Sequence, residues 1–151
     1  MNAKEFDTYF VKAGLRGIWW GAQPADFIIQ FPFQGPKLVI LNTDESGGKG
    51  LHWVAVYVPY SGPLEFFDPL GQSPETYHDY FRDWLVSSGR SYMRNDRRFQ
   101  DYATSTCGEF CVYYGVKRLR GETMREIVQS FKARDLSFNE IIVSDFVCKL
   151  I

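Results

Sequence analysis

The 151-residue sequence has few of the residues that build metal sites and disulfide frameworks. It holds three cysteines and two histidines, and their spacing matches no zinc finger, which needs about four ligands. Three cysteines are also too few, and odd in number, for a disulfide scaffold. We therefore expect no metal site, and a reducing compartment.

Long apolar runs and a charge of one sign are absent as well. No apolar run approaches the roughly 18 residues of a membrane-spanning helix, and no charged and then apolar leader opens the sequence. Seventeen basic and eighteen acidic residues are well mixed and give a formal net charge of −1. We therefore expect no membrane association, and weak or no nucleic acid binding.

Aromatic side chains, in contrast, are abundant. They make up 17% of the sequence, within a hydrophobic content of 45%, and such a composition is typical of a folded globule. The length suits a single core, and the sequence shows no repeat, low-complexity tract or linker. We expect one domain over residues 1–151, and a monomer.

Hydrophobic patterning predicts strands in the middle of the chain. Stretches rich in β-branched and aromatic residues occupy 37–42, 51–58 and 64–68, and a Ser-Gly-Pro turn joins the last two. We expect a further strand within 91–100. The turn-rich, aromatic stretch 17–36 is expected to be a loop packed on the domain.

Helical spacing is found at both ends and once between them. The first helix is expected over residues 3–13, capped by Asn2 and stopped by Gly14. Ser137 and Glu140 have the spacing of a capping box at the start of the last helix. The other predicted helices are Pro74–Val86, Cys107–Leu119, Glu122–Lys132 and Ser137–Lys149. The first of these is expected to have one aromatic side, formed by Tyr77, Tyr80, Phe81 and Trp84. Strands in the middle and helices at the end indicate an α+β fold.

Two cysteines lie four residues apart in the stretch TSTCGEFCVYYG. Cys107 opens a predicted helix, where the positive end of the helix dipole favours the thiolate and therefore nucleophilicity. Cys111 lies one turn later, deeper and among aromatic residues, where a thiol behaves as a small hydrophobe. We expect Cys107 to react and Cys111 to pack.

Two predicted strands supply partners for a cysteine nucleophile. Taken alone, His52 would be a core histidine and Asp68 a turn-forming residue before Pro and Gly. With Cys107 they form a Cys-His-acid set, in which the histidine takes the thiol proton and the acid orients the histidine. Gln100, seven residues before the cysteine, is either a solvated loop residue or an amide that reaches the oxyanion.

Three stretches together resemble adenain, the adenovirus maturation protease family. They are LNTDESGGKGLHWVAVYV, LEFFDPLG and FQDYATSTCGEFCVYY, in the family's order of histidine, acid and cysteine. The match spans roughly residues 14 to 115. It implies a mixed central sheet flanked by helices, with His52 as general base, Asp68 as its orienter, Cys107 as nucleophile and Gln100 as oxyanion donor.

The resemblance also implies a substrate and a setting. Trp53 would pack near the catalytic histidine, and Gly47 and Gly48 would join it in binding substrate. Family members cut viral capsid and core precursors at glycine-containing sites during virion maturation. The expected location is therefore the virion and the infected host cell, in its nucleus or a cytoplasmic viral factory.

Three departures from the family pattern change what is expected of activation. Asp68 stands where adenain usually has Glu, although either acid can hold an imidazole. Adenain's activating peptide forms a disulfide at a position that is Gly89 here, so any such peptide would dock non-covalently. Adenain is also longer and more basic and uses DNA as a cofactor. We therefore expect no required cofactor and little activation by DNA.

Two other functions fit part of the same pattern. One is a peptidase of the same clan that removes ubiquitin-like proteins, which would need a wide exosite for a folded partner. The other is a non-catalytic binding domain that kept the fold. The presence of all four proposed catalytic residues argues against a non-catalytic domain.

Overall fold

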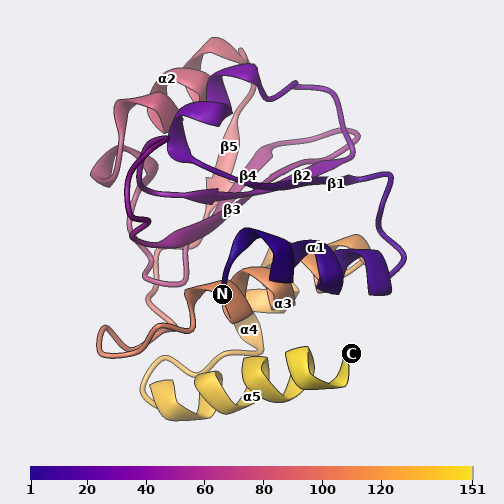
Figure 1. Ribbon diagram of the computed structural model, residues 1–151, viewed down its shortest axis with the longest axis vertical. Helices are drawn as coiled ribbons and strands as arrows, with labels where there is room; N and C mark the ends of the chain where they lie inside the picture. The colour runs from indigo at the N-terminus through magenta and orange to yellow at the C-terminus, as the bar shows by residue number, and fades with distance from the viewer. Residues whose placement is uncertain (151) are drawn as a thin grey trace.

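The computed structural model describes residues 1–150, which form three layers with a sheet in the middle (Figure 1). One face of the sheet carries the 3₁₀ turn η1, Ala25–Gln30, and helix α2, Asp79–Ser87. The other face carries α1, Ala3–Lys12, and α3, Cys107–Leu119. This arrangement confirms the expected mixed sheet flanked by helices.

The sheet contains five strands in the order β1-β2-β3-β4-β5. They are β1 Trp19–Gln23, β2 Lys37–Asn42, β3 Trp53–Val58, β4 Leu64–Phe67 and β5 Tyr92–Arg94. The three central strands pair antiparallel, whereas each outer strand pairs parallel to its neighbour. The central strands read as almost unbroken apolar runs because helices cover both of their faces.

Alternate residues of a strand point to opposite faces of a sheet, and β2 shows this clearly. Leu38 and Ile40 belong to the core between the sheet and helices α1 and α3. Val39 and Leu41 belong to the core between the sheet and η1 and α2. The core on the α3 side also takes residues from the two last helices, α4 Met124–Gln129 and α5 Leu136–Lys149. Figure 1 shows α5 as the outermost helix on that side.

Several predicted elements differ from those observed. The stretch 17–36 is not a loop, because β1 and η1 lie within it. The predicted helix Pro74–Val86 is divided into a 3₁₀ turn, η2 Pro74–Thr76, and α2. Only three residues of 91–100 form a strand. None of the helices within residues 1–150 is long and apolar enough to cross a membrane.

The two predicted helix starts had different outcomes. Asn2 caps α1, as predicted, and Glu5 completes a capping box with it. The expected Ser137–Glu140 box is wrong, because Asp135 is the N-cap of α5 and accepts a hydrogen bond from the Phe138 amide. The Glu140 carboxylate is therefore free to bind a different segment.

A buried ion pair fixes α3 to the sheet. Glu65 on β4 is only 4% exposed, and the Arg118 guanidinium donates to both of its carboxylate oxygens at 3.0 Å. The Tyr114 hydroxyl donates to the same carboxylate, and its ring stacks on Phe67 with centroids 4.4 Å apart. A buried carboxylate needs such donors, because its desolvation is otherwise uncompensated.

Removal of the arginine should therefore destabilise the fold. We expect Arg118→Met to lower the free energy of unfolding by about 2–3 kcal/mol, because Glu65 loses its counter-charge while remaining buried. Arg82→Met is the matched control: Arg82 pairs with Asp79 and Asp83 on the surface, where solvent screens the charges, so its loss should change the stability far less. Urea unfolding gives both values, and equal losses would contradict the argument.

Candidate active site

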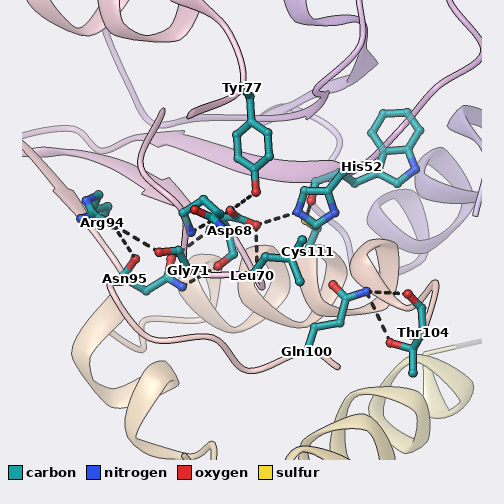
Figure 2. A network of polar contacts seen from close by, with 12 residues as sticks. His52, Asp68, Leu70, Gly71, Tyr77, Arg94, Asn95, Gln100, Thr104 and Cys111 are labelled. Carbon is teal, nitrogen blue, oxygen red and sulfur yellow. Dashed lines mark hydrogen bonds and ion pairs between the residues drawn. The ribbon is translucent and has the colours of Figure 1, made fainter. Parts of the chain in front are cut away.

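Asp68 lies at the centre of a network of polar contacts, directly after β4 (Figure 2). Its side chain is fully buried. One carboxylate oxygen, Oδ1, lies 2.6 Å from His52 Nε2 and accepts from the Leu70 amide at 2.9 Å. The other, Oδ2, accepts from the Gln72 amide at 3.0 Å and from the Tyr77 hydroxyl. These donors compensate the burial of the charge.

Tyr77 is a member of this network that the sequence did not reveal. Its spacing suggested one apolar side of a helix, yet it follows the 3₁₀ turn η2 and points its hydroxyl at Asp68 (Figure 2). Burial, together with the charge of Asp68, raises the pKa of Tyr77, so the phenol stays a hydrogen-bond donor. No local sequence signal marks a tyrosine that reaches an acid nine residues earlier.

Asn95 fixes the backbone of the same acid from the adjacent segment. Its side-chain oxygen accepts from the Asp68 amide at 2.9 Å, and its Nδ2 donates to the Asp68 carbonyl. Asn95 follows β5, which pairs with β4, so the two strand ends are joined by side-chain bonds beyond the ladder. The position of Asp68 is therefore set from both sides.

His52 occupies the position directly before β3, and not a position within the strand. Its Nε2 contact with Asp68 is the predicted one, and Nδ1 is left for a second partner. Burial lowers the pKa of His52, but hydrogen bonds to Asp68 and to Cys107, together with their charges, outweigh it and raise the pKa from 6.5 to about 9. The imidazole thus lies between the acid and the thiol.

Cys107 is the first residue of α3, as predicted, and is 8% exposed. Cys111 is fully buried one turn later, and its thiol donates to the Trp53 carbonyl at 3.5 Å. Burial is the main cause of the raised pKa of Cys111, so this thiol stays protonated. The two cysteines therefore differ: both are buried, but Cys107 opens the helix and keeps a small exposed fraction, whereas Cys111 packs in the core.

A groove of about 230 Å³ opens at Cys107. Its lining comes from the chain start, the loop before β3 and the start of α3, and comprises Met1, Asn42, Lys49, Gly50, Leu51, Trp53, Ser105 and Cys107. The Trp53 indole donates to the Met1 carbonyl at 3.1 Å and meets the Phe6 ring edge-on. Trp53 thus forms a wall of the groove.

Gly47 and Gly48 line a second hollow of about 250 Å³, which shares Asn42, Lys49 and Trp53 with the groove. Gly47 has φ +84°, a backbone conformation that residues with a side chain rarely adopt. A Cβ atom on Gly48 would lie 2.1 Å from the carboxylate of Asp44. The two glycines therefore set the path of the loop beside the groove. Their contact with substrate stays a prediction.

Gln100 is not a solvated residue, since it is 3% exposed. Its Nε2 donates to the Thr104 carbonyl at 3.2 Å (Figure 2), and its Oε1 has no partner among residues 1–150. The amide thus lies beneath the segment that leads into the nucleophile helix. Its role as oxyanion donor stays a prediction.

The second histidine lies outside this network. His78 precedes α2, pairs with Glu45 at 2.6 Å and stacks on Tyr80. Within residues 1–150 no group of three or more His, Cys, Asp or Glu side chains could hold a metal ion.

The arrangement is that of a known protease fold. The chain superimposes on the crystal structure of the ASFV pS273R protease with a TM-score of 0.56 and 16% identity, over 91% of this chain and 64% of that one. A selenomethionine structure of the same protease gives a TM-score of 0.43 and 23% identity, over 68% and 42% of the two chains. At these identities the likeness shows the fold alone.

A third similar structure is the central domain of the uncharacterized Lpg1148 protein from Legionella pneumophila. It gives a TM-score of 0.46 and 17% identity, over 87% of this chain and 86% of that one. No family model matches the chain, and no curated protein matches it in sequence. The expected membership of the adenain family therefore stays a prediction, whereas the protease fold is shown. The chain spans less than two thirds of the matched protease.

The raised pKa of His52 gives a test of the network. Asp68→Asn should lower it from about 9 toward 6.5, because the asparagine supplies no negative charge. NMR titration of His52 in the two proteins measures this. A His52 that titrates near 6.5 in both proteins would contradict the proposed contacts.

The same pKa has a consequence for stability. The folded state holds the His52 proton more tightly than the unfolded state, so this stabilisation is complete below about pH 6.5 and is lost as the pH rises through about 9. The free energy of unfolding should therefore fall between about pH 6.5 and pH 9, and this fall should be smaller in Asp68→Asn than in the wild type.

Proposed function

We propose that this chain is a cysteine endopeptidase in which Cys107 is the nucleophile, His52 the general base and acid, and Asp68 the orienter of the histidine. The observation that carries the proposal is the 2.6 Å contact between His52 and a fully buried Asp68, beside a thiol that opens a helix and lines a groove. The fold shared with a known protease supports it.

In the first half of the reaction, the Cys107 sulfur attacks the carbonyl carbon of a peptide bond. A protonated imidazole beside a thiol at a helix start favours the thiolate that this attack needs. His52 then donates its proton to the leaving amine, the C–N bond breaks, and a thioester joins the substrate to the enzyme. Asp68 keeps Nε2 of the ring occupied throughout, so Nδ1 stays directed at the reacting atoms.

In the second half, water attacks the thioester. His52 Nδ1 removes a proton from the water, and the Cys107 sulfur leaves as the acid product forms. The ring returns to its protonated state, and the thiolate is regenerated. Tyr77 and the two backbone amides on Asp68 hold the acid in one orientation during both proton transfers.

Both tetrahedral intermediates carry a negative oxygen that needs hydrogen-bond donors. The first N–H groups of α3 have no helical partner, since the first helical bond runs from the Phe110 amide to the Thr106 carbonyl. Gln100 Nε2 donates to the Thr104 carbonyl at 3.2 Å and makes a longer contact of 3.5 Å to the Thr104 hydroxyl oxygen. To serve as the side-chain donor, it would exchange the longer contact for a hydrogen bond to the oxyanion.

The proposed substrates are viral precursor polypeptides cut at glycine-containing sites, in the virion or the infected cell. Trp53 is one wall of the groove beside the thiol, and substrate residues without side chains near the scissile bond would fit against this wall. Gly47 and Gly48 extend the same surface and would contact the substrate further along.

The nucleophile assignment predicts different effects for the two cysteines. Cys107→Ala should abolish hydrolysis of peptides that contain Gly-Gly or Gly-x-Gly. Cys111→Ala should retain most of the rate and lose roughly 1–2 kcal/mol of stability, because it leaves a small cavity in the core. The measurements are product mapping by mass spectrometry and thermal unfolding.

Iodoacetamide at neutral pH provides the control that needs no substrate. It should modify Cys107 first, although Cys148 is exposed, because only Cys107 lies beside His52. Faster modification of Cys111 or Cys148 would contradict the assignment of Cys107 as the nucleophile.

The proposed enzyme is expected to act without a cofactor. The position that matches adenain's tethering cysteine is Gly89, which has φ +66° just after α2 and ends that helix. Arginines cluster locally in the stretch RNDRRF, residues 94–99. Two of them have partners: Arg98 stacks on Tyr102 and donates to the Gln100 carbonyl, and Arg97 lies over Phe99. An activating peptide, if one exists, would dock non-covalently.

We therefore predict a peptidase rate that DNA changes by less than about twofold at moderate salt, because few cations are available to displace phosphate counterions. Rates measured with reductant across a salt series, with and without duplex DNA, test this. A chain that is silent alone and is activated several-hundred-fold by DNA would overturn the prediction.

A further inference from the structure

The side chain of Glu140, on α5, reaches out of its own helix to the segment that precedes the nucleophile. One carboxylate oxygen accepts from the Thr104 hydroxyl at 2.7 Å and from the Asp101 amide at 3.3 Å. The other accepts from the Thr106 hydroxyl. Three donors from residues 101–106 thus converge on a single carboxylate.

Residues 101–106 connect the proposed oxyanion donor to the proposed nucleophile. Gln100 precedes the segment and donates to the Thr104 carbonyl within it, and Cys107 follows it. Residues 101–105 are exposed, so burial does not fix them. Other contacts of the segment are local ones, such as the Ala103 amide with the Asp101 carboxylate at 2.9 Å. The three bonds to Glu140 tie the segment to the body of the protein.

Thr106, the N-cap residue of α3, lacks the capping hydrogen bond usual at a helix start. Threonine at an N-cap position ordinarily accepts a hydrogen bond from an amide in the first turn of its own helix. Thr106 makes no such bond and has φ −90° and ψ 13°, outside the extended region usual for that position. Its hydroxyl is turned to Glu140 instead. The first-turn amides of α3 are therefore left without a side-chain acceptor, beside Cys107.

The neighbouring residue strengthens the connection. Asn139 is fully buried, and its Nδ2 donates to the Phe99 carbonyl at 3.2 Å and to the Lys132 carbonyl at 2.7 Å. Consecutive residues of α5 thus hold both ends of the segment that runs from Phe99 to Thr106. The start of α5 is joined to the site by specific polar bonds as well as by apolar packing.

We propose that Glu140 is a positioning residue of the active site. It holds residues 101–106 so that the Gln100 amide and the first-turn amides of α3 face the oxyanion. This inference rests on the proposed peptidase function and adds to it a residue from the last helix. Without the carboxylate, the segment loses its three bonds, and Thr106 is free to rotate back and cap its own helix.

The kinetic test compares Glu140→Ala with a control on the same helix. Glu140→Ala should lower kcat roughly ten- to hundred-fold and change KM little, because the lost interactions act on the transition state. Glu140→Gln, which keeps one acceptor oxygen, should fall between this variant and the wild type. Asp135→Ala removes the N-cap of α5, so it should lower Tm but leave kcat unchanged. Equal kcat for Glu140→Ala and the wild type would overturn the proposal, as would an equal fall in Asp135→Ala.

A double-mutant cycle with Thr106→Val tests whether Glu140 acts through its hydrogen bond with the Thr106 hydroxyl. The single change removes the Thr106 hydroxyl and should lower kcat, and the double variant should be no slower than Glu140→Ala alone, because both changes break the same bond. If the losses of kcat in the two single variants instead multiplied in the double variant, the two residues would act independently, which would contradict the proposal.

Hydrogen exchange separates this inference from the proposed function. The hydrogen-bonded amides of Asp101, Ala103 and Thr104 should exchange at least about tenfold faster in Glu140→Ala than in the wild type, but not in Asp135→Ala. This result requires no catalytic activity. A wild type without peptidase activity but with this exchange pattern would refute the proposed function and keep the structural tie, whereas unchanged exchange would refute the tie itself.

Discussion

The burial of one carboxylate organises this molecule around its proposed active site. Asp68 has no access to solvent, so each of its oxygens needs donors from the protein. The two amides that meet this need shape the turn after β4, and the two side chains, His52 and Tyr77, come from separate segments. The constraint that makes burial tolerable thus also aligns the imidazole. Folding stability and proposed catalytic geometry depend on the same bonds.

The sequence predicted the parts of the fold in which each segment's own pattern decides its structure. The central strands are apolar on both faces. The helix that begins at Cys107 follows a polar stretch of small residues and has a long buried side, so both its start and its packing could be recognised. Strand β1 was missed because Gly21 has φ +92° and the register shifts along its pairing with β2, so neither alternation nor burial is regular. The structure of such a segment depends on the strand beside it.

The site shows the same division between local and long-range information. The three elements carrying His52, Asp68 and Cys107 were recognisable from local signals and from the family resemblance, and the structure brings the three residues together. Tyr77 and Glu140 were assigned to a helix face and a capping box, because at their spacing these are the usual roles of an aromatic and an acid. Their actual partners lie 9 and 34 to 39 residues away in the sequence. Such contacts exist only once the chain has folded.

Helix α3, which carries the proposed nucleophile, is held at two points by two carboxylates. Glu65 on β4 binds Arg118 and Tyr114 in its second half, and Glu140 on α5 binds the residues at its start. The first carboxylate lies on β4, three residues before Asp68, which directly follows that strand, so the acid and the helix that carries the thiol share one support. The second comes from the layer farthest from the sheet (Figure 1). The outermost helix thus bonds to the segment beside the proposed site as well as covering the core.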